Sequence, residues 1–77
     1  MTNDNPDERA QTEPIASERI AQEHKIFFLD LKENKRGRFL KITEDVLGRR
    51  NTIMLPASAF KEFNDALGRL VVFESKL

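Results

Sequence analysis

The chain has 77 residues, with 13 basic and 13 acidic side chains and no cysteine. At this length it forms at most one small domain, which buries only roughly 60% of the surface of the unfolded chain. The missing cysteines exclude disulfides, thiolate nucleophiles and cysteine-ligated zinc. We therefore expect a partner chain to support the fold.

The net charge of zero averages two unlike parts of the chain. Residues 1–24 carry a net charge of −4, and residues 25–77 carry a net charge of +4. Asymmetry of this kind separates a tail from a binding body. No apolar run approaches the roughly 18 residues that span a bilayer, and the N-terminus is acidic rather than basic and then apolar. A soluble, intracellular protein is expected.

Residues 1–13 contain polar and acidic side chains with almost nothing apolar. Such a segment cannot bury enough surface to offset its ordering entropy, which predicts a disordered acidic tail. Residues 15–24 are ambiguous. Their propensity slightly favours a helix, whereas Ile15 and Ile20 as isolated apolar positions also fit a solvated edge strand.

The clearest strand covers residues 25–32, where three large apolar residues alternate with other types. Residues 33–37 read as a turn, because Asn tolerates the left-handed backbone region and Gly enters it without steric cost. Residues 39–43 resume the alternation. A β-hairpin is therefore predicted.

Alternation in the second strand of this hairpin separates two faces of the sheet. Leu40 and Ile42 point toward the core, and Phe39, Lys41 and Thr43 point to the opposite face. Periodicity alone leaves Phe39 open as a core residue or as an exposed ring. Its polar neighbours on the same face favour exposure.

Residues 44–50, which include Gly48, are predicted as the next connection. Residues 52–55 form a short third strand, which Pro56 ends. The three predicted strands make a meander.

The last predicted element is a helix from about residue 57 or 58 to about residue 73, with Ser58 as a candidate N-cap. Gly68 weakens it by about 1 kcal/mol relative to Ala. Residues 71–73 are unusually apolar for the end of a helix, which suggests contact with a second chain. The apolar residues that recur at helical spacing are Phe60, Phe63, Leu67, Leu70 and Val71.

Positive charge is concentrated between residues 32 and 41, which contain five Lys or Arg and one acid, Glu33. Phe39 lies inside this stretch, and Asn34 adds an amide. Phosphates attract cations and bases stack on flat rings, so the combination suits a single-stranded nucleic acid. Basic residues in a turn are also commonly just solvated, and the charge pattern alone does not decide between these readings.

The residues also carry a resemblance to a known family. IASERI, then HKIFFLDLKENKRGRFLKITE, then NTIMLPASAFKEFNDALGRL resemble one PUR repeat, the unit of the Pur-alpha family of single-stranded DNA and RNA binding proteins. The match covers roughly residues 15–73, and its most specific part is LDLKENKRGRFLKI.

The resemblance implies an α+β fold of four antiparallel strands followed by one C-terminal helix. In this family two repeats pair into one Whirly-like domain, and each helix packs on the sheet of the other repeat. Residues 15–23 then become a first strand, residues 14–77 form a single repeat, and the chain supplies the second repeat by forming a homodimer.

The resemblance also implies which residues meet the nucleic acid. Lys32 and Arg36 neutralise phosphates, and Asn34 offers a donor and an acceptor to a base edge. Phe39 stacks on a base, a contact worth about 1 to 3 kcal/mol. Arg38 and Lys41 are expected to add further contacts. The contact of Arg38 is the weaker expectation, because strand alternation places it on the face of the sheet opposite to that of Phe39 and Lys41.

Some positions depart from the family's pattern. Phe27-Phe28 stands where the family usually has an aromatic pair with Tyr. The loop DVLGRR replaces a Gly-rich basic loop, which leaves Arg49 and Arg50 as contacts without a supporting motif.

The implied function is binding of single-stranded DNA or RNA, with the purine-rich preference that the family's name suggests, in a cytoplasmic protein with access to a bacterial nucleoid. The alternative is a protein-interaction module that keeps the fold. We expect no enzymatic activity, cofactor or metal, because the chain has no Ser-His-Asp set, no phosphate-cradling Gly-rich loop and one histidine.

Overall fold

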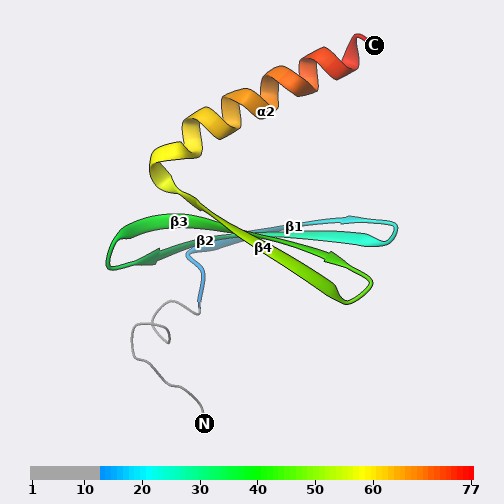
Figure 1. Ribbon diagram of the computed structural model, residues 1–77. Coiled ribbons are helices and arrows are strands. Elements are labelled where there is room, and N and C mark those ends of the chain that lie inside the picture. Colours follow the sequence, from blue (N-terminus) through cyan, green and yellow to red (C-terminus); the bar gives the residue numbers. More distant parts are fainter. Residues whose placement is uncertain (1–12) are drawn as a thin grey trace.

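The computed structural model describes residues 13–77 and shows a four-stranded antiparallel sheet followed by one helix (Figure 1). The strands pair in chain order β1-β2-β3-β4. The predicted α+β class and order of elements are confirmed. The predicted acidic tail, residues 1–13, lies outside the described residues except for Glu13. The elements are β1 (Ala16–Gln22), β2 (Lys25–Asn34), β3 (Gly37–Val46), β4 (Arg49–Pro56), the short 3-10 turn η1 (Ala57–Ala59) and α2 (Phe60–Ser75).

The first strand resolves the ambiguous stretch near the N-terminus. β1 pairs with β2 along its whole length, from Ala16 opposite Leu31 to Gln22 opposite Lys25. The slight helical propensity of this segment is therefore overruled, because pairing on an existing strand outweighs a weak local preference. Every residue of β1 is exposed in the single chain.

The connections between strands are tighter than the sequence predicts. The turn expected over residues 33–37 shrinks to Lys35-Arg36, and the connection expected over 44–50 shrinks to Leu47-Gly48. Leu47 has φ 52° and Gly48 has φ 90°. Positive φ at both central residues is the requirement of a type I′ hairpin turn, whose twist matches that of the paired strands. The long connection predicted after β3 is therefore wrong.

The helix begins later than predicted. Pro56 is extended and leads into η1, and α2 begins at Phe60 with Ala59 as its N-cap, which supplies no side-chain hydrogen bond. Ser58 is therefore not the N-cap. The C-terminal end lies at Ser75, whose hydroxyl donates to the carbonyl of Val72 at 2.6 Å.

Strand register divides the sheet into two faces. The basic face is the one that carries Phe39 and Lys41, and the apolar face is the one that carries Leu40 and Ile42, as alternation predicts. The charged strand residues of the basic face are Arg19, Lys32, Lys41 and Arg50 against Asp30 and Asp45. Those of the apolar face are Lys25, Arg38 and Arg49 against Glu18, Glu33 and Glu44. Only the basic face thus has an excess of positive charge.

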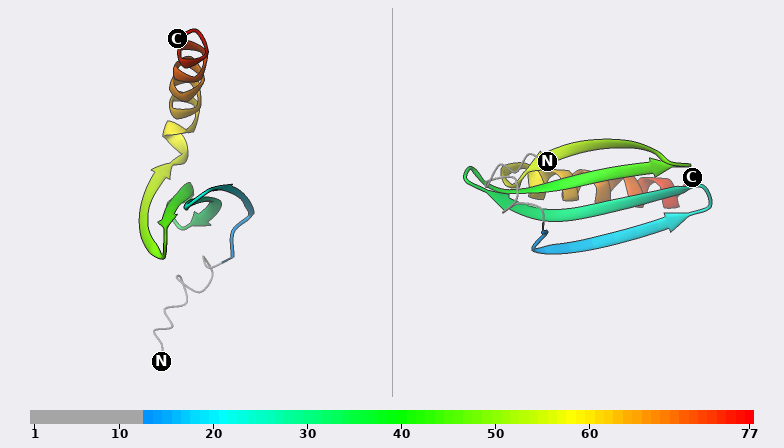
Figure 2. Two further views of the ribbon diagram at one scale, coloured as in Figure 1. Left: turned by 90° about the vertical axis from the view of Figure 1, so that its right-hand side faces the viewer. Right: turned by 90° about the horizontal axis from the view of Figure 1, so that it is seen from below.

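Within residues 13–77, the single chain encloses no hydrophobic core. The one buried residue of this part is polar, Thr43, which is 6% exposed. The helix stands off the sheet as an arm (Figures 1 and 2). The radius of gyration is 15.0 Å, against about 11 Å for a compact chain of this length. No helix in the described part is long and apolar enough to cross a membrane.

Candidate nucleic-acid interface

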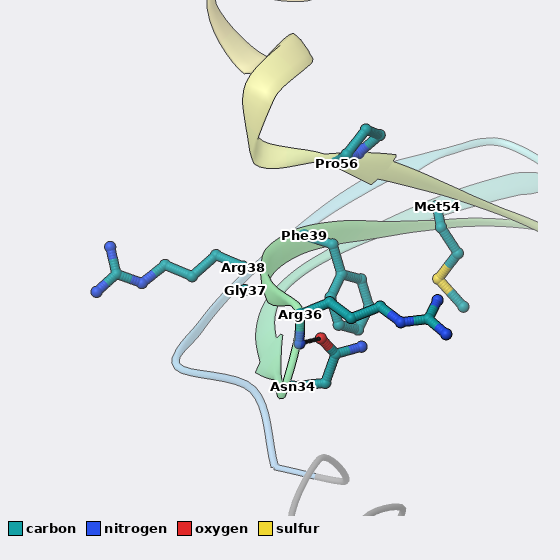
Figure 3. A pocket seen from close by; sticks show the side chains of 7 residues that line it. All are labelled: Asn34, Arg36, Gly37, Arg38, Phe39, Met54 and Pro56. Atoms are coloured by element: carbon teal, nitrogen blue, oxygen red, sulfur yellow. Dashed lines mark hydrogen bonds between the residues drawn. The ribbon is translucent and has the colours of Figure 1, made fainter.

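The β2–β3 hairpin presents its turn at one end of the sheet. The side-chain oxygen of Asn34 accepts a hydrogen bond from the backbone N–H of Arg36 at 2.8 Å, so the amide shapes the turn (Figure 3). Asn and Asp commonly bond their own backbone two residues on in this way. The acceptor of Asn34 is therefore used within the turn, and its NH₂ group is the part that can donate to a ligand.

A hollow of about 400 Å³ lies beside this turn on the basic face. It is lined by Asn34, Arg36, Gly37, Arg38, Phe39, Met54 and Pro56. Phe39 is paired with Pro56, and Met54 with Lys41, so neighbouring strands supply the ring and the thioether. Met54 is 60% exposed. The sequence prediction missed this residue, because its position depends on the register between β3 and β4.

Arg38 points away from Phe39, Arg36 and Met54 (Figure 3). Its Nε atom lies 3.8 Å from a carboxylate oxygen of Glu33, an ion pair on the apolar face. Although Arg38 lines the rim of the hollow, the structure does not bring its guanidinium together with the other predicted contacts.

The two lysines predicted as contacts lie on the basic face. Lys32 is directly opposite Phe39, and Lys41 lies between Asp30 and Met54. The Asp30 carboxylate accepts a hydrogen bond from the hydroxyl of Ser17 at 2.6 Å. Both lysines are half-buried. A long charged side chain of this kind can bury its stem against a surface while its ammonium group stays in water.

Two of the three acids of the apolar face, Glu33 and Glu44, are paired with bases on that same face. Lys25 Nζ lies 2.9 Å from a carboxylate oxygen of Glu44, and the hydrogen bond from Lys25 together with its charge lowers the pKa of Glu44. These acids therefore point away from a ligand on the basic face.

A second cluster lies toward the other end of the basic face. Arg50 is opposite Asp45 across the β3–β4 pair, and its Nε donates to a carboxylate oxygen of Asp45 at 2.9 Å. The guanidinium carbon of Arg50 lies over the ring of Phe28, 5.5 Å from the ring centre. The sequence indicated Arg50 without a motif, and its proximity to Phe28 was not predicted.

A four-stranded antiparallel sheet with one basic face that carries an exposed hollow and an aromatic ring is the kind of surface to which single-stranded nucleic acids bind in other proteins. The sequence model of the family described as PurA ssDNA and RNA-binding protein matches residues 1–75. This chain belongs to that family, as the resemblance implied.

Individual relatives support the same assignment. The chain is 47% identical over 51 residues to Transcription factor Pur-alpha 1 of Arabidopsis thaliana, a match that covers 66% of this chain and 17% of the relative. It is 44% identical over 73 residues to Transcriptional activator protein Pur-alpha of Homo sapiens, a match that covers 82% of this chain and 23% of the relative. It is 39% identical over 72 residues to Transcriptional regulator protein Pur-beta of Homo sapiens, a match that covers 74% of this chain and 23% of the relative. The chain thus spans less than a quarter of the length of these relatives.

Proposed function

We propose that this chain binds single-stranded DNA or RNA across its basic face and the β2–β3 hairpin. The observation that carries the proposal is the hollow beside the hairpin turn. None of the seven residues that line it is acidic, and an aromatic ring, a thioether and a guanidinium meet there. Such a surface offers stacking to a base and positive charge to the phosphates beside it.

The predicted contact residues of this site divide three roles among them. Phe39 stacks on a base, Arg36 and Lys32 neutralise phosphates, and the NH₂ group of Asn34 donates to a base edge. Lys41 extends the positive charge along β3. A Homo sapiens relative, 37% identical over 70 residues, is named Purine-rich element-binding protein gamma. We propose the same preference for purine-rich strands here.

Removal of two cations from the site tests the assignment. In the double variant Lys32→Ala, Arg36→Ala, we expect weaker binding to a purine-rich single strand and a flatter dependence of affinity on salt. Each phosphate contact on a single strand contributes about 0.7 to the slope of log affinity against log salt, so the slope should fall by about 1.4. Phe39→Ala should weaken binding with little change in slope, because it removes stacking and no charge.

The matched control for this experiment is Arg49→Ala, Lys61→Ala, which removes two cations that lie outside the basic face and outside the hollow. It should leave the affinity near that of the wild type. Equal losses in the two double variants would contradict the site. No binding of the wild-type chain to DNA or RNA at low salt would contradict the function and favour the protein-interaction module.

We further propose that two copies of the chain pair as a homodimer. The apolar face of the sheet is without a cover, and along the helix Leu67 is 52% exposed and Val71 58% exposed. Burying a large apolar side chain stabilises a fold by about 1.5 to 3 kcal/mol, so leaving both surfaces open sacrifices most of the available stability. A second copy offers a helix for the sheet and a sheet for the helix at once, and the contact closes as a twofold dimer.

A further inference from the structure

The basic face continues well beyond the hollow at the hairpin. Phe28 lies opposite Thr43 on β3, and Asp45 is the next residue of β3 on the same face. Phe39 and Thr43 are four residues apart, which is about 13 Å along a strand at roughly 3.3 Å per residue. Lys41 lies between them. The cluster around Phe28 is thus in line with Phe39, at a distance that one extended polymer can bridge.

The guanidinium of Arg50 is held in place from two sides. Its Nε donates to one carboxylate oxygen of Asp45 at 2.9 Å, and the other oxygen of Asp45 accepts the backbone N–H of Gly48 at 3.0 Å. The hairpin turn therefore fixes the carboxylate, and the carboxylate fixes the guanidinium. Phe28 lies beneath it, with its ring centre 5.5 Å from the guanidinium carbon.

The guanidinium is fixed without being covered. The Arg50 side chain is 63% exposed, whereas that of Asp45 is 16% exposed. An arginine plane held against a ring stacks on aromatic surfaces, and bases stack on arginine planes in single-stranded recognition. Because its orientation is already fixed, little side-chain entropy is lost when a base arrives.

We propose that Arg50, supported by Phe28 and Asp45, is a second stacking platform for a base of the same single strand that stacks on Phe39. This inference rests on the proposed function and extends it, since it sets the path of the strand from the hollow along β3, past Lys41, to Arg50. Asp45 offsets the charge of Arg50, so the contribution of Arg50 comes from its plane more than from its charge. Asp45 acts as a positioning residue.

The variant Arg50→Lys separates the plane from the charge, because it keeps a cation and removes the stacking surface. Its affinity should be compared with that of the wild type for a purine-rich strand of about 2 nucleotides, which is too short to reach from Phe39 to Arg50, and for one of about 12 nucleotides, which lies within the site sizes of small single-strand-binding modules. Arg49→Lys is the matched control, since Arg49 is adjacent in β4 and lies on the apolar face.

We expect Arg50→Lys to weaken binding of the long strand at least about fivefold, the lower end of the range for one lost stacking contact. The short strand, anchored at Phe39, should lose much less, and the salt dependence should stay unchanged. Arg49→Lys should leave the affinity for both strands unchanged.

An unchanged affinity of Arg50→Lys for the long strand would overturn the platform, and so would an equal loss for both lengths. If the wild-type chain binds and Phe39→Ala weakens it while Arg50→Lys does not, the platform alone is wrong. If the wild-type chain binds neither length, the proposed function fails together with the platform.

Discussion

Leu47 has a backbone conformation that is unfavourable for a leucine. It has φ 52° in the turn between β3 and β4, and its side chain is 79% exposed. The left-handed region costs a residue with a Cβ atom about 1 kcal/mol or more, and Asn tolerates it better than Leu does. The chain bears this cost without burying the leucine.

The variant Leu47→Asn should therefore raise the free energy of unfolding by about 1 kcal/mol. In a domain of this size that change raises the midpoint of thermal unfolding by about 4–8 °C. The midpoint is measured by circular dichroism at a fixed chain concentration, with Leu77→Asn as a control at another highly exposed leucine, outside the turn. A midpoint equal to that of the wild type would show that Leu47 makes a compensating contact in solution.

At the scale of the element, the helix has two unlike sides. One carries the apolar stripe, and the other has a shallow hollow lined by Asn64, Asp65, Gly68, Arg69 and Val72. A Cβ atom placed on Gly68 would meet no other atom within 4 Å. The single chain therefore gives no packing reason for this glycine, which lies in the interior of α2.

Gly68→Ala should stabilise the protein by about 1 kcal/mol, the difference in helix propensity between the two residues. Chemical denaturation of both proteins at matched concentration measures this difference. The side of α2 that carries Gly68 faces away from the apolar stripe and stays open in the proposed dimer. Destabilisation by Ala would instead show that another backbone approaches Gly68 closely.

The sequence predicts the first hairpin and its faces well because large apolar residues alternate there without interruption. Alternation alone therefore assigns Phe39 and Lys41 to the same face, which the strand register confirms. Met54 and Arg50 could not be placed, since their position depends on the pairing of β4 with β3. That register is set by a two-residue turn. Asn or Asp usually occupies the first position of such a turn and makes it recognisable in a sequence, whereas here the position is occupied by Leu47.

The start of the helix shows a second limit of sequence reasoning. Ser58 has the side chain of an N-cap, yet Pro56 is extended and η1 intervenes before α2 begins. A preference for one residue type at a cap cannot reveal a preceding 3-10 turn, because that turn depends on how the chain leaves the edge of the sheet.

At the scale of the whole molecule, the large apolar surfaces of residues 13–77 are open to solvent in the single chain. Small domains are marginal even with a complete core. An extended molecule with a radius of gyration of 15.0 Å has the shape expected of one half of a two-chain unit. In the proposed dimer, stability and association should be inseparable.

Leu67→Asp should convert the dimer to monomers that are largely unfolded, because it places a charge in the centre of the apolar stripe. Sedimentation measures the mass, which for the wild type should be twice the 8.9 kDa of one chain. Arg69→Asp is the matched control, since Arg69 lies on the hollow side of α2, away from the apolar stripe. A wild-type mass of one chain at micromolar concentration would contradict the dimer.

The three two-residue turns that connect the strands also bear on how fast the protein folds. Each strand pairs with the next one in the chain, so the contacts of the sheet are short in sequence, and topologies of this kind form quickly. In the proposed dimer, by contrast, the cover for the apolar face arrives only by collision with another chain. Folding would therefore proceed as a fast step within one chain followed by a slow encounter, and dilution would lengthen the time during which the bare sheet is exposed to aggregation.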